Sequence, residues 1–140
     1  MYNPCVIILI CVILHINIIY SLIKQEEKMS DCLFCKIIAG EITSTKVYED
    51  ELVYVFKDIE PIAPFHALVV PKKHYTSILD VNEDDKIINH IFAVCKNIAK
   101  DQGFDEKGFR IINNCGEDGG QSVHHLHFHL LAGKKLSWEA

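Results

Sequence analysis

The chain has 140 residues, a length that indicates one domain with a modest core. Its net charge of −5 at pH 7 provides no basic surface for phosphate backbones, so we expect no nucleic-acid partner. Of the six cysteines only Cys32 and Cys35 have motif spacing, and this distribution favours reduced thiols over a disulfide framework.

Residues 5–23 form an apolar run without a formal charge, close to the length that spans a bilayer. A signal peptide is one explanation, although no Lys or Arg precedes the run and no small-x-small cleavage site follows it. An uncleaved anchor and an extension translated from an upstream start are the others. We therefore divide the chain into a leader, residues 1–28, and a folded domain, residues 29–140. A protein that starts at Met29 is expected in the cytoplasm and also the nucleus. A protein that keeps the leader is expected to be membrane-anchored or to follow the secretory route.

The folded part alternates short strands with two helices. Ser30-Asp31 supplies N-cap chemistry for a short helix from Cys32 to about Ala39. Asn82 is expected to cap a longer helix over about 83–101. Apolar runs and turn residues predict strands at 46–49, 52–56, 66–70 and 109–112. Short loops between neighbouring strands favour antiparallel pairing, so the predicted fold class is α+β.

A fifth strand is predicted where His125, His127 and His129 alternate with apolar residues. Its period of two places three imidazoles on one face, with the first and third about 13 Å apart. That distance is too long for one metal ion and suits an extended phosphate ligand. Residues 113–120 just upstream form a glycine-rich turn able to aim amide groups at phosphate oxygens. Together these features indicate a phosphate-handling site.

The pattern His-x-His-x-His followed by Leu130-Leu131 resembles the histidine triad (HIT) superfamily. Further residues resemble its Hint branch, the histidine triad nucleotide-binding or protein kinase C interacting protein-like members: Asn114, Gly119 to Val123, Pro71 to His74, and Trp138. The resemblance covers about residues 30–138. It implies a HIT-like fold with a five-stranded antiparallel sheet, one long and one short helix, a homodimer, and a nucleotide beside the triad strand.

Catalytic and phosphate-binding roles follow from the resemblance. It implies that His127 is the nucleophile and that His66 orients it through its backbone carbonyl. The groups expected to contact the phosphate or the leaving group are His129, Ser122, Asn114, Gly120 and Gln121. A neutral imidazole near pH 7 suits such a nucleophile, and its neighbours suit oxyanion stabilisation.

For the nucleoside, the resemblance implies that Asp58 accepts the ribose hydroxyls. The residues expected around the base are Leu33, Phe34, Phe56, Ile59 and Leu68, and Trp138 is expected to reach the active site of a partner subunit. Without the resemblance, these apolar residues would be read as core and Asp58 as a solvated acid. A purine preference is implied by the family alone.

A structural zinc ion, one per chain, is the only cofactor expected, and no organic cofactor is. Hint relatives with a CxxC place two cysteines and two histidines at a metal, which here correspond to Cys32, Cys35, His74 and His125. Such a Cys₂His₂ set is tetrahedral and closed, as structural zinc requires. The alternative is that the two cysteines are ordinary buried thiols. If His125 binds zinc, it is not available to phosphate.

The leading hypothesis is a purine nucleoside phosphoramidase, a hydrolase of P–N bonds that converts AMP-NH₂ and AMP-amine conjugates to AMP through a nucleotidyl-histidine. One alternative is a dinucleoside polyphosphate hydrolase of another HIT branch, which disagrees with the Hint-like run from Gly133 to Trp138. The other is a non-catalytic nucleotide- or zinc-binding module with regulatory protein partners. A module of that kind would not need Ser122, His127 and His129 together.

Overall fold

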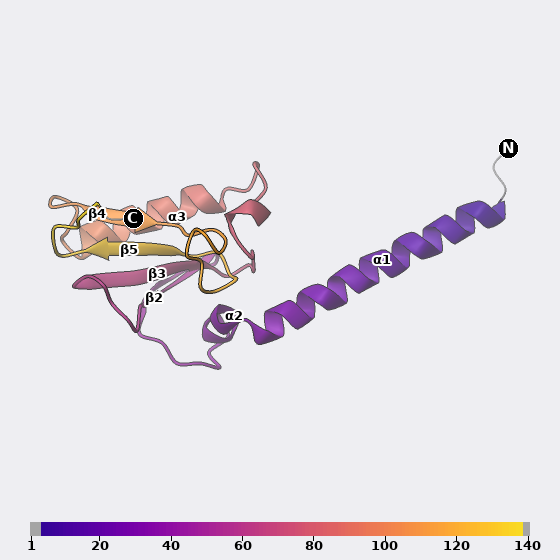
Figure 1. The fold of residues 1–140 in the computed structure, drawn as a ribbon, viewed down its shortest axis with the longest axis horizontal. Helices are drawn as coiled ribbons and strands as arrows, with labels where there is room; N and C mark the ends of the chain where they lie inside the picture. Colours follow the sequence, from indigo (N-terminus) through magenta and orange to yellow (C-terminus); the bar gives the residue numbers. More distant parts are fainter. Residues whose placement is uncertain (1–3, 139–140) are drawn as a thin grey trace.

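The computed structural model describes residues 4–138, and their side chains except at 4–7, 9 and 25–30 (Figure 1). Its elements in chain order are α1 (Pro4–Asp31), α2 (Leu33–Ile38), β1 (Lys46–Glu49), β2 (Val53–Lys57), β3 (Phe65–Pro71), the 3-10 helix η1 (Ile78–Asp80), α3 (Ile87–Asp101), β4 (Phe109–Ile112) and β5 (Phe128–Ala132).

The five strands form one antiparallel sheet in the order β1-β2-β3-β5-β4. The central strand β3 is buried along its whole length. Its Leu68 pairs with Phe56 of β2 on one side and with His129 of β5 on the other. Because paired residues point to the same face, these three side chains form a row across the sheet. The fold confirms the expected α+β, HIT-like architecture.

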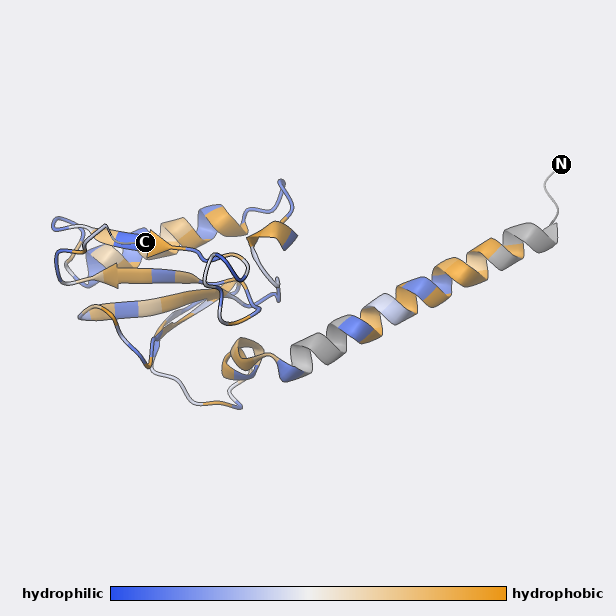
Figure 2. Cartoon of the chain, in the orientation of Figure 1, coloured by the Kyte–Doolittle hydropathy of each residue, from blue (hydrophilic) through white to orange (hydrophobic). Residues whose placement is uncertain are grey.

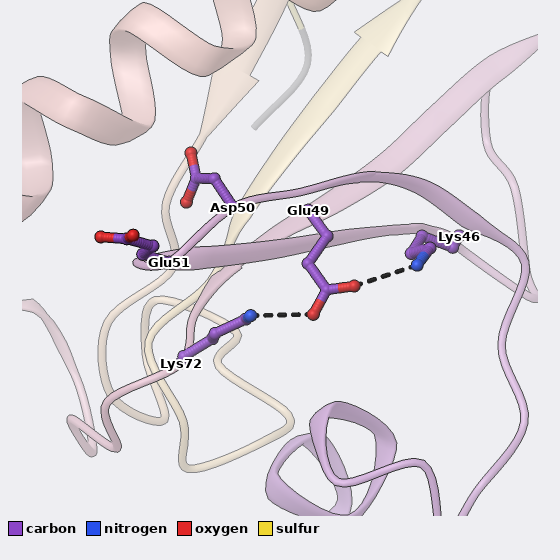
Figure 3. Close-up of a pocket in the computed structure, with 5 residues that line it drawn as sticks. All are labelled: Lys46, Glu49, Asp50, Glu51 and Lys72. Carbon is purple, nitrogen blue, oxygen red and sulfur yellow. Dashed lines mark hydrogen bonds and ion pairs between the residues drawn. The ribbon is translucent and has the colours of Figure 1, made fainter.

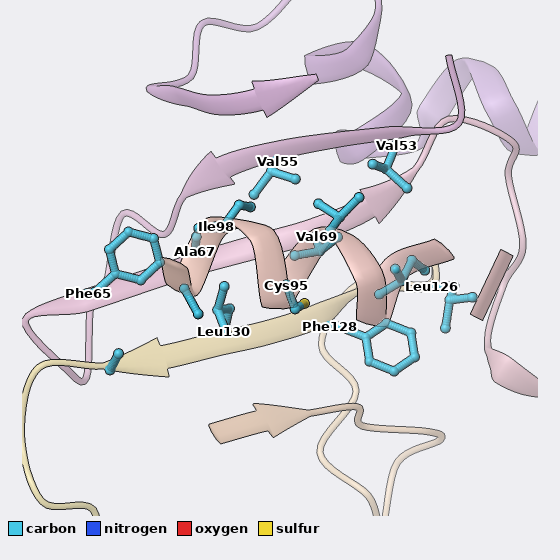
Figure 4. Packing of buried hydrophobic residues seen from close by; sticks show 14 of the residues in the cluster. Val53, Val55, Phe65, Ala67, Val69, Cys95, Ile98, Leu126, Phe128 and Leu130 are labelled. Atoms are coloured by element: carbon cyan, nitrogen blue, oxygen red, sulfur yellow. The ribbon is translucent and has the colours of Figure 1, made fainter. Parts of the chain in front are cut away.

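Helix α3 covers the opposite face of the sheet. Its apolar stripe, which includes Ile91, Cys95 and Ile98, packs against alternate residues of three strands, among them Val55 and Val69 (Figure 4). Each side chain in this cluster is buried, so α3 and the sheet form the main core. The other face of the sheet is covered by α2, whose Phe34 and Ile37 pack on Phe56, Leu68 and Val70.

The fifth strand begins later than predicted, at Phe128, so His125 and His127 precede it. Residues 123–125 bend instead of extending, and the Leu126 N–H donates to the carbonyl of Tyr75 (2.7 Å). The bend brings His125 and His127 into the protein, whereas a straight strand would have kept one evenly spaced row of imidazoles.

Two predicted helix starts also differ from the structure. Ser30 and Asp31 belong to the end of α1, and the N-cap of α2 is Cys32, whose sulfur accepts from the Cys35 N–H (3.5 Å). Helix α3 starts at Ile87 and not near Asn82, because residues 83–84 form a separate turn in which the Asp85 N–H donates to the Asn82 carbonyl (3.0 Å). The Asp85 carboxylate then accepts the Ile87 N–H (3.0 Å).

The leader forms most of α1, which extends away from the sheet (Figure 1). Its described apolar side chains, such as Ile13, Leu14 and Ile18, are exposed and give α1 the apolar colouring of Figure 2. Among the residues whose side chains are described, no helix is long and apolar enough to cross a membrane.

Candidate active site and metal-binding cluster

Two cysteines and two histidines from three segments meet at one end of the sheet. Cys32 and Cys35 come from the first turn of α2, His74 follows β3, and His125 lies in the bend before β5. Their donor atoms all lie within 4.8 Å of one another. The Cys32 Sγ is 3.3 Å from His125 Nδ1, the Cys35 Sγ is 3.3 Å from His74 Nδ1, and the two Nδ1 atoms are 3.2 Å apart. The four predicted residues therefore form one Cys/His cluster with the donor atoms to hold a metal ion.

These distances match the edges of a tetrahedron around a metal ion. With Zn–N near 2.0–2.1 Å and Zn–S near 2.3 Å, tetrahedral angles give edges of about 3.3 Å for N–N and about 3.6 Å for S–N. His125 is also held in the necessary tautomer, because its Nε2–H donates to the Pro71 carbonyl (2.8 Å) and leaves the Nδ1 lone pair facing the sulfurs. Burial lowers the pKa of His125 to about 4, so its ring is neutral and able to bind metal.

Cys35 shows why this cluster suits a cation. Burial, followed by the hydrogen bond and the charge of Cys32, raises the pKa of its thiol to about 12. Two neighbouring thiolates would repel each other in this half-buried position. A bound dication reverses that balance and favours both thiolates.

His127 is almost fully buried, with 3% of its surface exposed. Its Nδ1–H donates to the carbonyl of His125 (2.7 Å), and its ring packs against Phe34 with centroids 5.1 Å apart. In the neutral ring Nε2 is therefore unprotonated. Burial lowers the pKa of His127, which keeps this lone pair available near pH 7. The side-chain amide of Asn113, which the sequence analysis did not identify, fixes the backbone here by donating to the His127 carbonyl (2.8 Å).

His66 does not orient His127 as predicted. Its backbone carbonyl accepts the Asp58 N–H (3.0 Å) at the end of the strand pairing, while His127 uses the carbonyl of His125. The ring of His66 instead contacts His129. Because the Ile62 N–H donates to His66 Nδ1 (3.3 Å), His66 carries its proton on Nε2, which lies 2.9 Å from His129 Nδ1.

The tautomer of His129 follows from this contact. Its Nδ1 accepts from His66, so its own proton lies on Nε2. Burial, followed by the neighbouring His127 and His66, lowers the pKa of His129 to about 4, and the ring is neutral. Asp58 completes the group, with Oδ2 3.2 Å from His66 Nε2.

A cavity of about 810 Å³ opens beside these histidines. Nine of the predicted residues line it: Leu33, Phe34, Phe56, Asp58, Ile59, Leu68, Ser122, His127 and His129. Ile59 is 94% exposed, so it forms the rim of the cavity, while Phe56 and Leu68 form its floor. The sequence analysis missed Ile37 and the segment Ile42 to Thr45, which also line the cavity. Helical spacing identifies Ile37, which lies four residues after Leu33 and three after Phe34. The segment has no such pattern.

The glycine-rich turn covers residues 116–120. Gly120 adopts φ +74°, and a Cβ on Gly119 would lie 2.3 Å from the Cys115 carbonyl oxygen. The Gly120 N–H donates to the Glu117 carbonyl within the turn (2.9 Å), so this amide is not directed at a phosphate as predicted. Asn114 and Gly120 lie outside the cavity lining, whereas Ser122 and Val123, which follow the turn, line the cavity.

Gln121 has a structural role that differs from the predicted contact with nucleotide. Its buried side chain accepts the Gly116 N–H (3.0 Å) and donates to the carbonyls of Thr76 (2.7 Å) and Val123 (3.0 Å). These three bonds occupy its polar atoms and hold the turn against the segment after β3. Gln121 therefore positions Ser122 and does not itself face the cavity.

Trp138 lies outside the cavity of its own chain and is 92% exposed. The Arg110 guanidinium stands 5.7 Å from its ring centroid and donates to the carbonyl of Ser137 (2.8 Å). The tail is thus held along β4. The expected contact with a partner subunit stays a prediction.

A second hollow near the β1–β2 turn has no comparable chemistry. It is lined by Lys46, Glu49, Asp50, Glu51 and Lys72 (Figure 3). Glu49 pairs with both lysines, at 3.0 Å from Lys46 and 2.8 Å from Lys72. These charges neutralise one another on an open surface, and no nucleophile lies among them.

The sequence and the fold of this chain are similar to those of known proteins with a HIT domain. Residues 39–136 match the family model described as HIT domain. A histidine triad protein from Clostridium difficile is 59% identical, with a TM-score of 0.76, over 79% of this chain and 96% of its own. A HIT family hydrolase from Legionella pneumophila is 46% identical, with a TM-score of 0.75, over 77% and 97%. An uncharacterized HIT-like protein of Methanocaldococcus jannaschii is 50% identical over 102 residues, 71% of this chain and 77% of its own.

Proposed function

The chain belongs to the HIT domain family, and on that premise we propose that it is a nucleoside phosphoramidase of the Hint branch. It hydrolyses the P–N bond of AMP-NH₂ and of AMP-amine conjugates and releases AMP. One observation carries the proposal: the Nδ1 proton of His127 is committed to a backbone carbonyl, which leaves the Nε2 lone pair in a cavity shared with Ser122 and His129.

In the first half of the reaction, His127 Nε2 attacks phosphorus and the bond from phosphorus to the amine breaks. The amine leaves with the bonding electron pair and takes up a proton that water delivers through the Ser122 hydroxyl. In the second half, water attacks phosphorus and the bond to His127 breaks, with its electron pair returning to Nε2. The proton that the attacking water loses replaces the one delivered to the amine, and AMP departs. A histidine nucleophile suits this route because its phosphoramidate adduct is itself reactive.

His129 and Ser122 stabilise the charge that develops on phosphorus. The Nε2–H of His129 is fixed as a donor by the hydrogen bond from His66 to its other nitrogen. Preorganised donors of this kind cost no rearrangement when the negative charge forms. His66 thus acts on the donor histidine rather than on the nucleophile.

The nucleoside fits the remainder of the cavity. The base lies between the α2 residues Leu33 and Phe34 and the floor residues Phe56 and Leu68, with Ile59 at the rim. Asp58, whose Oδ1 accepts the Glu60 N–H (2.9 Å), accepts the ribose hydroxyls. An apolar slot with one carboxylate is a common arrangement for such a ligand. The purine preference of this proposal comes from the Hint resemblance.

We assign zinc to the cluster of Cys32, Cys35, His74 and His125, whose donor set fits a closed tetrahedral site. When bound, the ion supplies structural stability by joining α2 to the segments that flank β3 and β5. Cys35 follows the cavity residue Phe34 in the chain, and the carbonyl of His125 accepts the Nδ1–H of the cavity residue His127. The zinc therefore positions the cavity wall and takes no part in the reaction. The enzyme is proposed to act as a homodimer.

The proposal is tested by AMP release from AMP-NH₂ compared with release from a dinucleoside polyphosphate. We expect the phosphoramidate to be preferred, and acid-labile nucleotide to be trapped on the protein when labelled turnover is quenched. His127→Asn should abolish the trapped nucleotide and lower kcat by about 10³-fold or more. The matched control is His15→Asn, at an exposed histidine of α1. Undiminished turnover by His127→Asn would overturn the mechanism.

A further inference from the structure

A hollow of about 410 Å³ lies directly beside the cavity and is lined by Glu117, Gly120, Gln121, Ser122 and His124. Ser122 lines both the cavity and this hollow, so the two spaces adjoin at its side chain. The base slot and the ribose carboxylate lie elsewhere in the cavity. The hollow is therefore space next to the reacting phosphorus that the nucleoside does not fill.

The direction of attack points toward this hollow. In phosphoryl transfer the entering and leaving atoms are roughly in line. His127 is buried and approaches from the protein interior, against Phe34. The leaving amine must then depart on the outer side, where Ser122 and His124 are exposed.

The charge of the hollow comes from one carboxylate. Glu117 is exposed at the start of the glycine turn, and neither Lys nor Arg is among the lining residues. The polar atoms of Gln121 are already bonded to backbone groups. The imidazole of His124 is the other titratable group that faces this space. A further hollow shares Leu33, Ser122 and Val123 with the cavity and His124 with the first hollow, and its charged lining residues, Lys24 and Asp31, are of opposite sign.

We propose that the hollow beyond Ser122 is the leaving-group subsite, and that Glu117 makes the enzyme prefer amines that carry a second, positively charged group. The inference rests on the proposed function. The same carboxylate repels an anionic leaving group, which disfavours a polyphosphate there. Because Glu117 is exposed, its attraction is modest and screened by salt.

The test compares three AMP phosphoramidates of similar length at pH 8, where histidine side chains are in general uncharged. Their amines are 1,4-diaminobutane, which keeps a free ammonium, pentylamine, which is neutral, and 4-aminobutyrate, which is anionic. At low ionic strength we expect kcat/KM to be about three-fold higher for the ammonium substrate than for the neutral one, and lowest for the anionic one. The preference should shrink toward unity in 0.5 M salt.

Glu117→Gln should remove the preference, and Glu117→Lys should reverse it in favour of the anionic substrate. The matched control is Glu51→Gln, at an exposed acid in the distant hollow near the β1–β2 turn, which should keep the wild-type ratio. Hydrolysis without a charge preference, or a preference that survives both Glu117 variants, would overturn this inference and leave the phosphoramidase intact. Failure to hydrolyse any of the three substrates would instead refute the proposed function.

Discussion

At the scale of single residues, the hydrogen-bond partner of one ring nitrogen determines what the other nitrogen of each histidine can do. His125 donates to the Pro71 carbonyl and offers Nδ1 to the cluster, whereas His127 donates to the His125 carbonyl and offers Nε2 to the cavity. His129 accepts from His66 and becomes a donor. On these partners rests our proposal that three imidazoles within five residues serve as a metal ligand, a nucleophile and a hydrogen-bond donor. Their chemical difference comes from which ring nitrogen each partner occupies.

The zinc assignment predicts that Cys32→Ser loses the metal. We expect about one zinc per chain in wild-type protein purified without a metal-affinity tag, and less in the variant, by elemental analysis. The free energy of unfolding should fall by roughly 3 kcal/mol or more, because binding of a structural metal contributes directly to folding. The matched control is Cys11→Ser, since Cys11 is an exposed thiol of α1 outside the cluster. Folded, active wild-type protein without zinc would contradict the assignment.

At the scale of elements, a hydrogen-bonded carboxylate joins the β1–β2 turn to α3. Asp50 accepts the N–H groups of Leu52 (2.8 Å) and Val53 (2.9 Å) and also contacts His90 Nε2 of α3 (2.7 Å). Burial acts to raise the pKa of Asp50, but these bonds and one from Tyr48 outweigh it and hold the pKa at about 2. The charged form of Asp50 therefore stabilises the packing of α3 on the sheet.

This contact predicts a stability difference that depends on pH. Because the folded-state pKa of Asp50 is depressed, its contribution is present above the ordinary value near 3.9 and is lost as pH falls to about 2. After allowance for solvent screening, Asp50→Asn should lower the free energy of unfolding by about 1 kcal/mol at pH 7. The difference from wild type, measured by urea unfolding, should shrink below the ordinary pKa of Asp and be lost as the pH falls through about 2. Asp84→Asn, at an exposed acid before α3, should show no such dependence.

At the scale of the whole molecule, the residues assigned to the cavity and the metal cluster all lie beyond residue 28, while α1 extends away from them (Figure 1). The exposed edges of the sheet are β1 and β4. Phe109 of β4 and Phe92 of α3 are exposed apolar side chains, and we propose that the surface around them forms the interface with a second subunit.

A chain of residues 29–140 is therefore expected to fold, to bind one zinc and to hydrolyse AMP-NH₂ as the full chain does. Sedimentation should show a dimer, since the proposed interface does not need α1. A stable dimer typically buries about 1,200–2,000 Å² in total. A requirement for residues 1–28 in folding or activity would contradict the domain division, and a fully active monomer would contradict the proposed dimer.

Much of this protein follows from sequence alone, because local patterns determine it. Alternating and helical apolar spacing located the five strands and α3, with a boundary error at the start of α3, which begins at Ile87 and not just after Asn82. The CxxC and the histidine motif, through the family they resemble, identified the four residues that meet in the Cys/His cluster, and the zinc itself stays a prediction. These features depend on residue type and spacing within a few positions of the chain.

Only the tertiary structure decided how the histidines are used. Alternation predicted one straight row of imidazoles, but the bend at residues 123–125 places His125 against Pro71 and separates it from the cavity. The partners of His66 and Gln121 were likewise not those expected, because they lie far away in sequence: His129 is 63 residues from His66, and Thr76 is 45 from Gln121. A hydrogen bond forms wherever folding brings an unpaired donor and acceptor together, so no pattern within a short segment specifies these contacts.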